Sequence, residues 1–360
     1  MVARLTLIVK TDPFNPDESV ISKAVEILRN GGLVAFPTET VYGLGASISR
    51  KDAIKKIFSV KGRPMDNPLI VHVDSIDMFL NLTLNPPEYL INALEKLWPG
   101  PFTIVYWKSS SVPGEASANL PKAAYRSPAH RVALKLINYL GEAIVAPSAN
   151  KSGKPSPTTA QHVYSDLGGS IDMIIDAGET LYGIESTIID FTSVPPRLLR
   201  PGALAVEKIS EILGIEIEIP LEARGFGEFG EALAPGMKYK HYAPEAELVV
   251  VESGDYSDLN KLINMVKKLI SDARSKYRSV AVICSSETCS SYLDTNIKII
   301  EIGSRKDIFQ IAKNIFKTLR RLDEEKIEFA IVEGFEEKGL GLAVMNRLRK
   351  ASGGRIVHID

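Results

Sequence analysis

The stretch Ala146-Pro147-Ser148-Ala149-Asn150-Lys151-Ser152-Gly153-Lys154-Pro155-Ser156-Pro157-Thr158 follows the apolar run 143–145 and sets hydroxyl, amide and lysine side chains between glycine and prolines. Glycine and short polar residues let backbone N–H groups converge on phosphate oxygens, while Lys151 and Lys154 add positive charge. Apolar strands that end in polar loops are typical of α/β folds, which build their sites there. The stretch therefore predicts an α/β protein that binds an anion.

Two upstream segments have the same character. Phe36-Pro37-Thr38-Glu39-Thr40-Val41-Tyr42-Gly43-Leu44-Gly45 comes at the end of a strand expected at 33–36. Lys61-Gly62-Arg63-Pro64-Met65-Asp66-Asn67-Pro68 leads into a strand-like run at 69–73. Because polar residues flank an apolar strand in each case, we expect both segments to join the first stretch in one site.

The first 220 residues alternate between helical and strand patterns. Helical spacing of apolar residues predicts helices between Asp17 and Gly31, around 53–58 and around 90–97. Buried strands are expected at 103–107, 143–145, 173–175 and 186–190. We therefore predict one large α/β domain over residues 1–220, with a twisted mixed sheet.

The segment 221–245 has the composition of a linker. Its first half, 224–230, matches Gly-x-Gly-x-x-Gly, yet a strand before it and a helix after it are missing, so it is not interpreted as a dinucleotide fingerprint. Its second half, 234–244, is rich in aromatic and basic side chains between prolines. Such a segment is expected to dock on a surface near the active site rather than to stand in water.

Residues 246–360 repeat a strand, helix, strand rhythm. Strands are expected at 248–251, 280–283, 297–300 and 329–332, with helices over 259–269, 306–321 and 343–350. This pattern predicts a smaller, doubly wound (Rossmann-like) C-terminal domain.

Composition narrows the class of protein. The formal net charge of -1 over 360 residues argues against wholesale electrostatic binding to nucleic acid. No apolar segment reaches the ~18 residues of a membrane span, and we expect a cytoplasmic protein. Cys284 and Cys289 do not have Cys-x-x-Cys spacing and no histidine is near, so we expect ordinary thiols, with neither a zinc site nor a disulfide.

Several polar residues are candidates for a ligand site, and each also has a structural reading. Lys61 and Arg63 can face a polyphosphate from one extended loop, or form a solvated basic turn. Asn67 can bind a ligand or cap its turn. His72 lies in an apolar strand, where a core position is the more common one. Arg126 can pair with a substrate carboxylate or with a structural one.

Familiar catalytic motifs are missing from the sequence. It has no Walker loop, no His-Glu-x-x-His and no Gly-x-Ser-x-Gly, and only five histidines. Metal hydrolases and serine hydrolases are therefore disfavoured. What remains is a phosphate-rich ligand held by scattered Lys, Arg, Ser and Asn, which indicates transfer chemistry driven by positioning and charge stabilisation.

At these residues the chain resembles the Sua5/YrdC/YwlC family of threonylcarbamoyl-AMP synthases, in its two-domain Sua5 form. The resemblance covers almost the whole chain, through the segments 37–45, 61–64, 67–72, 98–101, 146–150, 155–158, 185–188, 199–202 and 235–244. It implies a nucleotidyltransferase that makes threonylcarbamoyl-adenylate and pyrophosphate from L-threonine, bicarbonate or CO2, and ATP. The product would serve N6-threonylcarbamoylation of adenosine 37 in tRNAs that read ANN codons, through downstream transferase machinery.

The resemblance also implies roles for individual residues. It assigns to ATP the residues Lys61, Arg63, Asn67, Ser148, Asn150, Ser156, Arg200 and, more weakly, Tyr242. It assigns to threonine the residues Thr40, His72, Arg126, Ser186 and, more weakly, Thr38. Lys61 and Arg63 would offset the charge that grows on the triphosphate. Mg2+ is expected to arrive with the nucleotide, so no metal site made by protein side chains is predicted, nor any prosthetic group.

One position departs from the family pattern. Members usually have Thr-Val-x-Val-Arg before the arginine, whereas this chain has Lys122-Ala123-Ala124-Tyr125-Arg126. Lys122 is therefore not assigned to the substrate. Tyr239, His241 and Tyr242 in the linker are candidates for lid or nucleotide contacts, or for structural docking alone.

Two other functions are compatible with the residues. A non-catalytic RNA-binding module would use Lys61, Arg63, Lys151 and Lys154 as a basic face for tRNA or rRNA, with salt-sensitive binding. A carbamoyltransferase that acts on a protein partner would need carbamoyl phosphate as its donor.

Overall fold

The computed structural model describes residues 5–227, 229–230, 232–237 and 242–359. The chain divides into two compact units. The first comprises residues 1–152, 156–220 and 229–238, and the second comprises residues 153–155, 221–228 and 239–360. The expected linker at 221–245 is thus shared between the two units. No helix in the described part of the chain combines the length and the hydropathy that crossing a bilayer requires.

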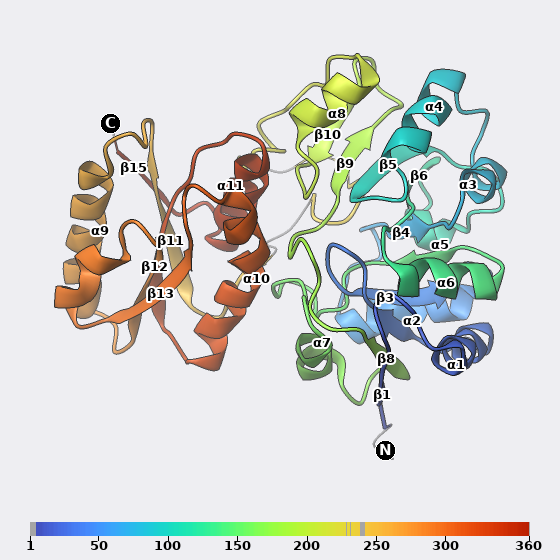
Figure 1. Cartoon of the computed structure of the whole chain (residues 1–360), viewed down its shortest axis with the longest axis horizontal. Coiled ribbons are helices and arrows are strands. Elements are labelled where there is room, and N and C mark those ends of the chain that lie inside the picture. Colours follow the sequence, from blue (N-terminus) through green and yellow to red (C-terminus); the bar gives the residue numbers. More distant parts are fainter. Residues whose placement is uncertain (1–4, 228, 231, 238–241, 360) are drawn as a thin grey trace. The chain divides into compact units, whose positions relative to one another are not determined.

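The first unit is built on one mixed sheet of ten strands (Figure 1). Its strand order is β1-β8-β2-β3-β7-β4-β6-β5-β9-β10. The strands are β1 (Leu7–Lys10), β2 (Val34–Phe36), β3 (Gly43–Ser47), β4 (Ile70–His72), β5 (Phe102–Trp107), β6 (Lys122–Arg126), β7 (Ile144–Ala146), β8 (Met173–Asp176), β9 (Thr187–Asp190) and β10 (Arg197–Arg200).

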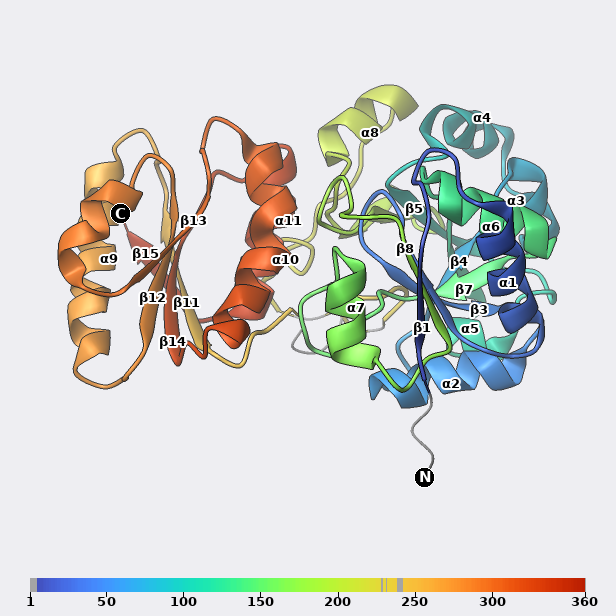
Figure 2. The same cartoon turned by 60° about the horizontal axis from the view of Figure 1, so that its bottom comes forward.

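Helices cover this sheet and bury its apolar side chains. They are α1 (Glu18–Arg29), α2 (Lys51–Lys61), α3 (Ile76–Leu82), α4 (Glu88–Leu97), α5 (Gly114–Ser117), α6 (Arg131–Leu140), α7 (Ala160–Leu167) and α8 (Val206–Leu213). α1 begins where the sequence predicts, because the Asp17 side chain accepts a hydrogen bond from the Ser19 N–H and caps the helix. α1 and α6 lie side by side (Figure 2) and bury Leu28 and Leu136 against strands β2, β7 and β8.

The second unit has a five-stranded parallel sheet in the order β13-β12-β14-β11-β15. Its elements are β11 (Glu247–Ser253), α9 (Leu259–Arg274), β12 (Val280–Ser285), the 3-10 helix η1 (Cys289–Thr295), β13 (Lys298–Gly303), α10 (Ile308–Glu324), β14 (Phe329–Glu333), α11 (Leu340–Ala351) and β15 (Ile356–Ile359). Figure 1 shows α9 on one face of the sheet and α10 and α11 on the other. The doubly wound C-terminal domain is therefore confirmed, and with it the predicted fold class.

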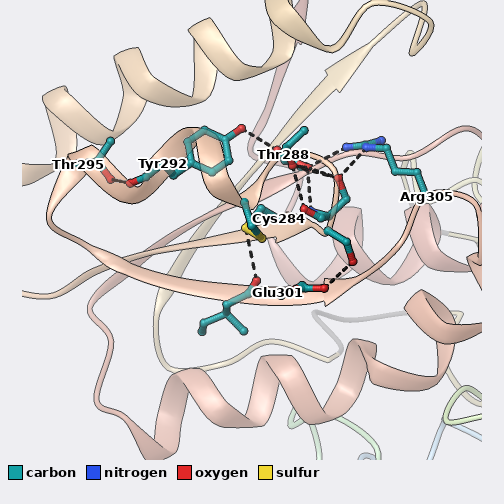
Figure 3. The surroundings of a disulfide bond; sticks show 11 residues. Cys284, Thr288, Tyr292, Thr295, Glu301 and Arg305 are labelled. Atoms are coloured by element: carbon teal, nitrogen blue, oxygen red, sulfur yellow. Dashed lines mark hydrogen bonds and ion pairs between the residues drawn. A yellow bond between two sulfur atoms is a disulfide. The ribbon is translucent and has the colours of Figure 1, made fainter.

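The expectation of two unpaired thiols is wrong. Cys284, near the end of β12, forms a disulfide with Cys289, the first residue of η1 (Figure 3). The residues between them reverse the chain, so the two Cα atoms lie 5.4 Å apart, within the range that a disulfide spans. The spacing rules for zinc and redox motifs do not describe a tight strand-to-helix turn of this kind.

The glycine-rich segment 224–230 does not form a dinucleotide fingerprint. Residues 221–225 form a turn, and no strand or helix contains any residue from 214 to 246 that the structure describes. The Arg349 guanidinium lies 4.2 Å from the centre of the Phe226 ring and donates to the Arg224 carbonyl. A side chain at Gly225, whose φ is +95°, would meet Arg349, so this turn is fitted to α11.

Candidate functional site

Three of the predicted threonine and phosphate contacts lie in one row across neighbouring strands of the first unit. His72 at the end of β4 pairs with Arg126 at the end of β6. On the next strands, Thr103 of β5 pairs with Ile188 of β9, which in turn pairs with Arg200 of β10. The sheet register therefore sets a histidine and two arginines, widely separated in sequence, on one line. All three side chains are buried.

His72 is held as a neutral ring. Burial, and secondly the positive charge of Arg126, lower the pKa of His72 to about 3. Its Nδ1 lies 3.2 Å from the Ile70 carbonyl oxygen, and its ring meets the edge of Phe36. At neutral pH the ring can therefore donate or accept a hydrogen bond but adds no charge.

Arg126 faces a carboxylate that the sequence analysis did not place in the site. Its Nη2 lies 2.7 Å from Oε1 of Glu39, and each side chain is only 4% exposed. The Arg126 Nε donates to the Gly100 carbonyl at 3.4 Å. The sequence analysis expected Arg126 to pair either with a substrate carboxylate or with a carboxylate of the protein. In this structure it pairs with the carboxylate of Glu39. Glu39 reaches it because residues 39–41 bend; in an extended segment its side chain would project away from those of Thr38 and Thr40.

Thr38 and Thr40 stabilise that bend. The Thr38 hydroxyl donates to the Val41 carbonyl at 2.7 Å and lies 2.8 Å from the Thr40 hydroxyl. Both threonines are buried beside Glu39. The segment thus brings two hydroxyls and one carboxylate together at the end of β2.

Ser186 and Arg200 form a second buried contact. The Arg200 guanidinium donates to the Ser186 carbonyl at 2.9 Å and to its hydroxyl at 3.2 Å, and it also reaches the Pro235 carbonyl. The Ser186 hydroxyl lies 2.7 Å from that of Thr103, a residue that the sequence analysis missed. This contact needs Gly202, since a Cβ there would lie 2.3 Å from the Ser186 carbonyl carbon.

Lys61 ends α2 and points into the loop that follows β7. Its Nζ donates to the carbonyl oxygens of Ser148 and Asn150. The Ser148 hydroxyl donates to the Asn150 side chain at 2.5 Å. In addition, Lys151 donates to the Val60 carbonyl at 2.8 Å, which fixes the loop on the end of α2. The structure therefore brings together Lys61, Ser148 and Asn150, three residues that the resemblance assigns to ATP.

Arg63 and Asn67 form a closed turn between α2 and β4. The Arg63 guanidinium donates to the Asn67 side-chain oxygen at 2.5 Å, to the Asn67 carbonyl at 3.0 Å and to the Pro68 carbonyl at 2.9 Å. Both side chains are buried. The solvated basic turn considered for this segment is thus excluded.

Side-chain and backbone hydrogen bonds connect the segments that carry these groups. Ser156 donates to the Glu185 carboxylate at 2.6 Å, so the loop after β7 reaches the residue that precedes Ser186. The Tyr42 N–H donates to the Pro157 carbonyl, and the Ala149 N–H donates to the Tyr42 carbonyl. The three polar segments of the sequence therefore meet, as their composition predicts.

Two residues with uncertain roles have structural partners. Lys122 lies over the Trp107 ring and 3.4 Å from Asp190, at the far end of β6 from Arg126. Tyr242 is buried in the second unit, with its ring 5.1 Å from that of Phe316 and beneath the Arg347 guanidinium. Tyr239 and His241 lie outside the described residues.

Sequence reasoning missed Glu39, Thr103 and Glu185. Glu39 had a usable signal, because it is the only charged residue between Arg29 and Arg50. A lone carboxylate in such an apolar stretch must find a partner when it is buried. Thr103 and Glu185 carried no comparable signal.

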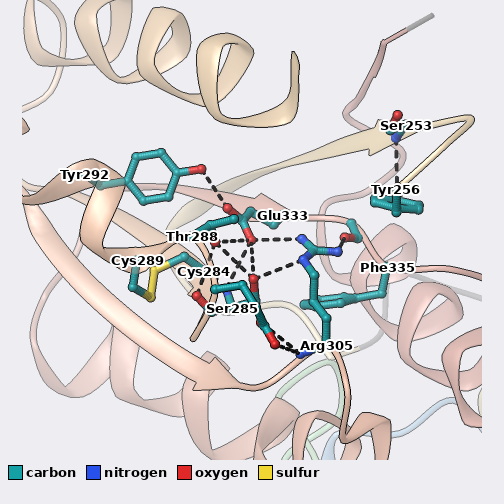
Figure 4. Close-up of polar contacts among 12 residues, drawn as sticks. Ser253, Tyr256, Cys284, Ser285, Thr288, Cys289, Tyr292, Arg305, Glu333 and Phe335 are labelled. Carbon is teal, nitrogen blue, oxygen red and sulfur yellow. Dashed lines mark hydrogen bonds and ion pairs between the residues drawn. A yellow bond between two sulfur atoms is a disulfide. The ribbon is translucent and has the colours of Figure 1, made fainter. Parts of the chain in front are cut away.

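The second unit has a separate buried polar cluster, centred on Glu333 at the end of β14 (Figure 4). Its carboxylate accepts hydrogen bonds from Tyr292 at 2.6 Å, Thr288 at 2.8 Å and Arg305 at 2.9 Å, and from the Ser285 N–H and hydroxyl. Arg305 in turn lies against the Tyr256 and Phe335 rings. These contacts satisfy the fully buried carboxylate within the protein.

The described residues contain no group of three or more His, Cys, Asp or Glu side chains arranged to hold a metal ion. The donors gathered in the first unit are instead cations, hydroxyls and amides, which suit anionic and polar organic ligands. The fold and the site define a two-domain α/β protein with a buried cationic site in its larger, mixed-sheet unit.

Comparison with known proteins agrees with this class. Residues 26–202 match the Sua5/YciO/YrdC family model, described as "Telomere recombination", and residues 204–353 match "Threonylcarbamoyl-AMP synthase, C-terminal domain". The chain is 47% identical to the threonylcarbamoyl-AMP synthase of Pyrococcus abyssi, over 95% of this chain and 97% of that protein. It is 40% identical to that of Bacillus subtilis, over 96% and 97%.

A solved structure gives the same result. The crystal structure of P. abyssi Sua5 complexed with L-threonine superposes with a TM-score of 0.91 at 45% identity, covering 99% of this chain and 100% of that one. The chain belongs to the Sua5/YrdC/YwlC family, in its two-domain Sua5 form.

Proposed function

We propose that this chain is an L-threonylcarbamoyladenylate synthase, a nucleotidyltransferase that uses L-threonine, bicarbonate or CO2, and ATP. The observation that carries the proposal is the burial of four cations, Lys61, Arg63, Arg126 and Arg200, together with several hydroxyl groups in one unit. Burying so much positive charge is unfavourable unless an anion or fixed dipoles offset it. Relatives that match nearly the whole chain carry this synthase name.

The threonine subsite is proposed to lie along the strand row. Arg126 would pair with the α-carboxylate, since a guanidinium matches a carboxylate with two parallel hydrogen bonds. Thr40, Thr38, neutral His72 and Ser186 would surround the rest of the amino acid with uncharged donors and acceptors. The Sua5 structure with bound L-threonine supports threonine as the substrate.

The nucleotide subsite is proposed to lie at the loop after β7. Its residues would be Lys61, Arg63, Asn67, Ser148, Asn150, Ser156 and Arg200, with Tyr242 as a weaker candidate. The Lys61 and Arg63 hydrogen bonds described above go to neutral carbonyl and amide oxygens, which orient the cations without cancelling their charge. The phosphates of ATP would accept charge-assisted hydrogen bonds from these cations.

The chemistry needs no protein nucleophile. The threonine ammonium is first deprotonated. The amine then adds to CO2 with release of a proton, or to bicarbonate with release of water, to give a carbamate. A carbamate oxygen attacks the α-phosphorus of ATP in line. The bond from the α-phosphorus to the bridging oxygen breaks, and pyrophosphate leaves with the electron pair. Lys61 and Arg63 act by stabilising the negative charge that develops on the phosphates.

Mg2+ is proposed to be bound by the phosphates and water, because the described residues offer no carboxylate cage for it. When bound, it would neutralise phosphate charge. The labile adenylate would pass to a transferase that modifies adenosine 37 of tRNAs reading ANN codons, so tRNA is an indirect partner. We propose that these steps take place in the cytoplasm.

Substitution of the two cations tests this assignment. In Lys61→Ala and Arg63→Ala we expect threonylcarbamoyl-adenylate formation to fall about 10²- to 10³-fold, the usual effect of removing one transition-state donor. Mass spectrometry of the product measures it. Lys55→Ala and Arg50→Ala are matched controls, because both side chains lie exposed beside Glu115 and Asp52. Unchanged product formation in both site variants would contradict the assignment.

A further inference from the structure

We propose that Glu39 binds the ammonium group of L-threonine, so that Glu39 and Arg126 together recognise the amino acid as a zwitterion. The inference rests on the proposed function, since it deepens the description of its threonine subsite. It adds a specificity-determining carboxylate to a set of residues that otherwise contains only cations, hydroxyls and an imidazole.

The first argument is the incomplete pairing of two buried charges. Glu39 and Arg126 are an ion pair by distance, at 2.7 Å, yet the N–H directions miss the carboxylate. Three buried atoms make no hydrogen bond of acceptable geometry with any described residue. They are the two carboxylate oxygens of Glu39 and the Nη2 of Arg126. Buried groups of this kind are normally satisfied, and an exception indicates a missing partner. Here the missing partner must donate to a carboxylate and accept from a guanidinium.

The second argument is distance. In an α-amino acid, the nitrogen and the carboxyl carbon are separated by one carbon and lie about 2.5 Å apart. A threonine whose carboxylate pairs with Arg126 therefore carries its ammonium within reach of an adjacent carboxylate. Glu39 is that carboxylate, and its Oε2 is buried with no hydrogen-bond partner among the described residues.

The third argument is charge. Besides Arg126, the side chains of Tyr182 and His130 interact electrostatically with Glu39. Burial, and secondly Glu39 itself, raise the pKa of Tyr182, while burial lowers the pKa of His130 against the pull of Glu39. Both side chains are therefore neutral at pH 7. A bound zwitterion adds one positive and one negative charge, which leaves the balance of the site unchanged.

The alternative is that Glu39 only positions Arg126. The two roles differ in which ligand they affect. If Glu39 only positions Arg126, its loss weakens the binding of every ligand whose carboxylate pairs with Arg126. L-Threonine shares this carboxylate with (2S,3R)-2,3-dihydroxybutanoate, the analogue with a hydroxyl in place of the ammonium. A residue that contacts the ammonium affects L-threonine alone.

Calorimetric titration of the full chain with both ligands separates them. We expect wild type to bind L-threonine about 10- to 100-fold more tightly than the analogue, as a hydrogen bond between charged groups provides, and Glu39→Gln to lose that preference. Glu39→Asp keeps the charge and should keep part of the preference, even if the glutamine variant folds poorly. Glu115→Gln, which removes a paired carboxylate on α5, is the control and should behave as wild type.

Equal weakening of both ligands in Glu39→Gln would overturn the inference, and so would an unchanged preference. These results leave the proposed function standing, provided that wild type still forms threonylcarbamoyl-adenylate. A wild type that neither prefers L-threonine nor forms the adenylate would overturn both.

Discussion

At the scale of single residues, backbone carbonyl oxygens hold the buried cations of the first unit. Lys61 donates to two of them, Arg63 to two and Arg200 to two. A carbonyl has a dipole but no formal charge, so these hydrogen bonds fix each cation while its positive charge persists. This fixed orientation is what the proposed nucleotide subsite requires of its cations.

His72 gives a pH-dependent prediction. Because its pKa is about 3 when folded, against about 6.5 when unfolded, the unfolded chain binds one more proton between these values. We expect stability to fall as pH drops from 6.5 toward 3, by about 1.4 kcal/mol per pH unit from this residue. In His72→Gln the dependence should be shallower, as urea unfolding at pH 7 and pH 5 would measure. Equal slopes in both proteins would contradict a neutral, buried His72.

The proximity of several of these residues was predictable from the sequence, whereas the contact between Glu39 and Arg126 was not. Lys61, Arg63, Asn67, Ser148 and Asn150 stand in polar loops beside apolar strands, and the structure brings them together. The Glu39 contact depends on a bend that only the folded chain creates, since in an extended segment Glu39 would project away from its threonine neighbours.

At the scale of elements, the close approach of β10 and β9 sets the position of Ser186 and Arg200. Gly202 makes this approach possible, because a Cβ at that position would lie 2.4 Å from both the Glu185 carbonyl oxygen and the Thr187 nitrogen. The obstructing atoms belong to the backbone, so they cannot move aside as a flexible side chain would.

We therefore expect Gly202→Ala to separate the two segments. Overpacking of this kind lowers the free energy of unfolding by about 1–3 kcal/mol. L-threonine and ATP affinities should both fall, since Ser186 and Arg200 lose their contact. Gly254→Ala, where a Cβ meets no atom within 4 Å and φ is not positive, shows the effect of replacing a glycine without a clash. Wild-type ligand affinities in Gly202→Ala would contradict this reading of the contact.

The disulfide fixes the start of η1 on the end of β12, next to the residues that satisfy Glu333. It closes a short loop, with a sequence separation of five, so chain entropy predicts a stabilisation of about 2 kcal/mol. We expect Cys289→Ser, or reduction of wild type, to lower the free energy of unfolding by that amount in a urea titration. A reduced wild type as stable as the oxidised protein would show that the bridge is dispensable.

Several elements were not predicted, for reasons that differ. β15 (Ile356–Ile359) is an edge strand of only four residues, and its apolar residues Ile356, Val357 and Ile359 could have been recognised. Cys284 and Cys289 were read by motif spacing alone, and the turn that joins them is visible only in the folded chain. α6 has a strong apolar stripe, at Val132, Leu136 and Leu140, that could have been recognised.

At the scale of the whole molecule, each unit has its own sheet and its own apolar core. The fold class was predictable because periodicity changes along the chain, from a long mixed pattern to a regular strand and helix alternation. The matches to complete two-domain synthases favour the enzyme over the RNA-binding module that the basic residues also allow.

Overall charge yields a prediction against that module. With a net charge of -1, the chain lacks the basic excess that drives salt-dependent binding to RNA. We expect tRNA to bind no more tightly than about 10⁻⁶ M at physiological salt, the range of non-specific contacts. Filter binding over a salt series measures this. A nanomolar complex with a steep salt slope would restore the RNA-binding hypothesis.

The most direct test of the synthase proposal is pyrophosphate release by the purified protein, with ATP, L-threonine and bicarbonate omitted in turn and the products identified by mass spectrometry. The proposed reaction predicts that release needs all three and that threonylcarbamoyl-adenylate appears in equal amount. Release that persists without L-threonine or bicarbonate, or no release when all three are present, would contradict it.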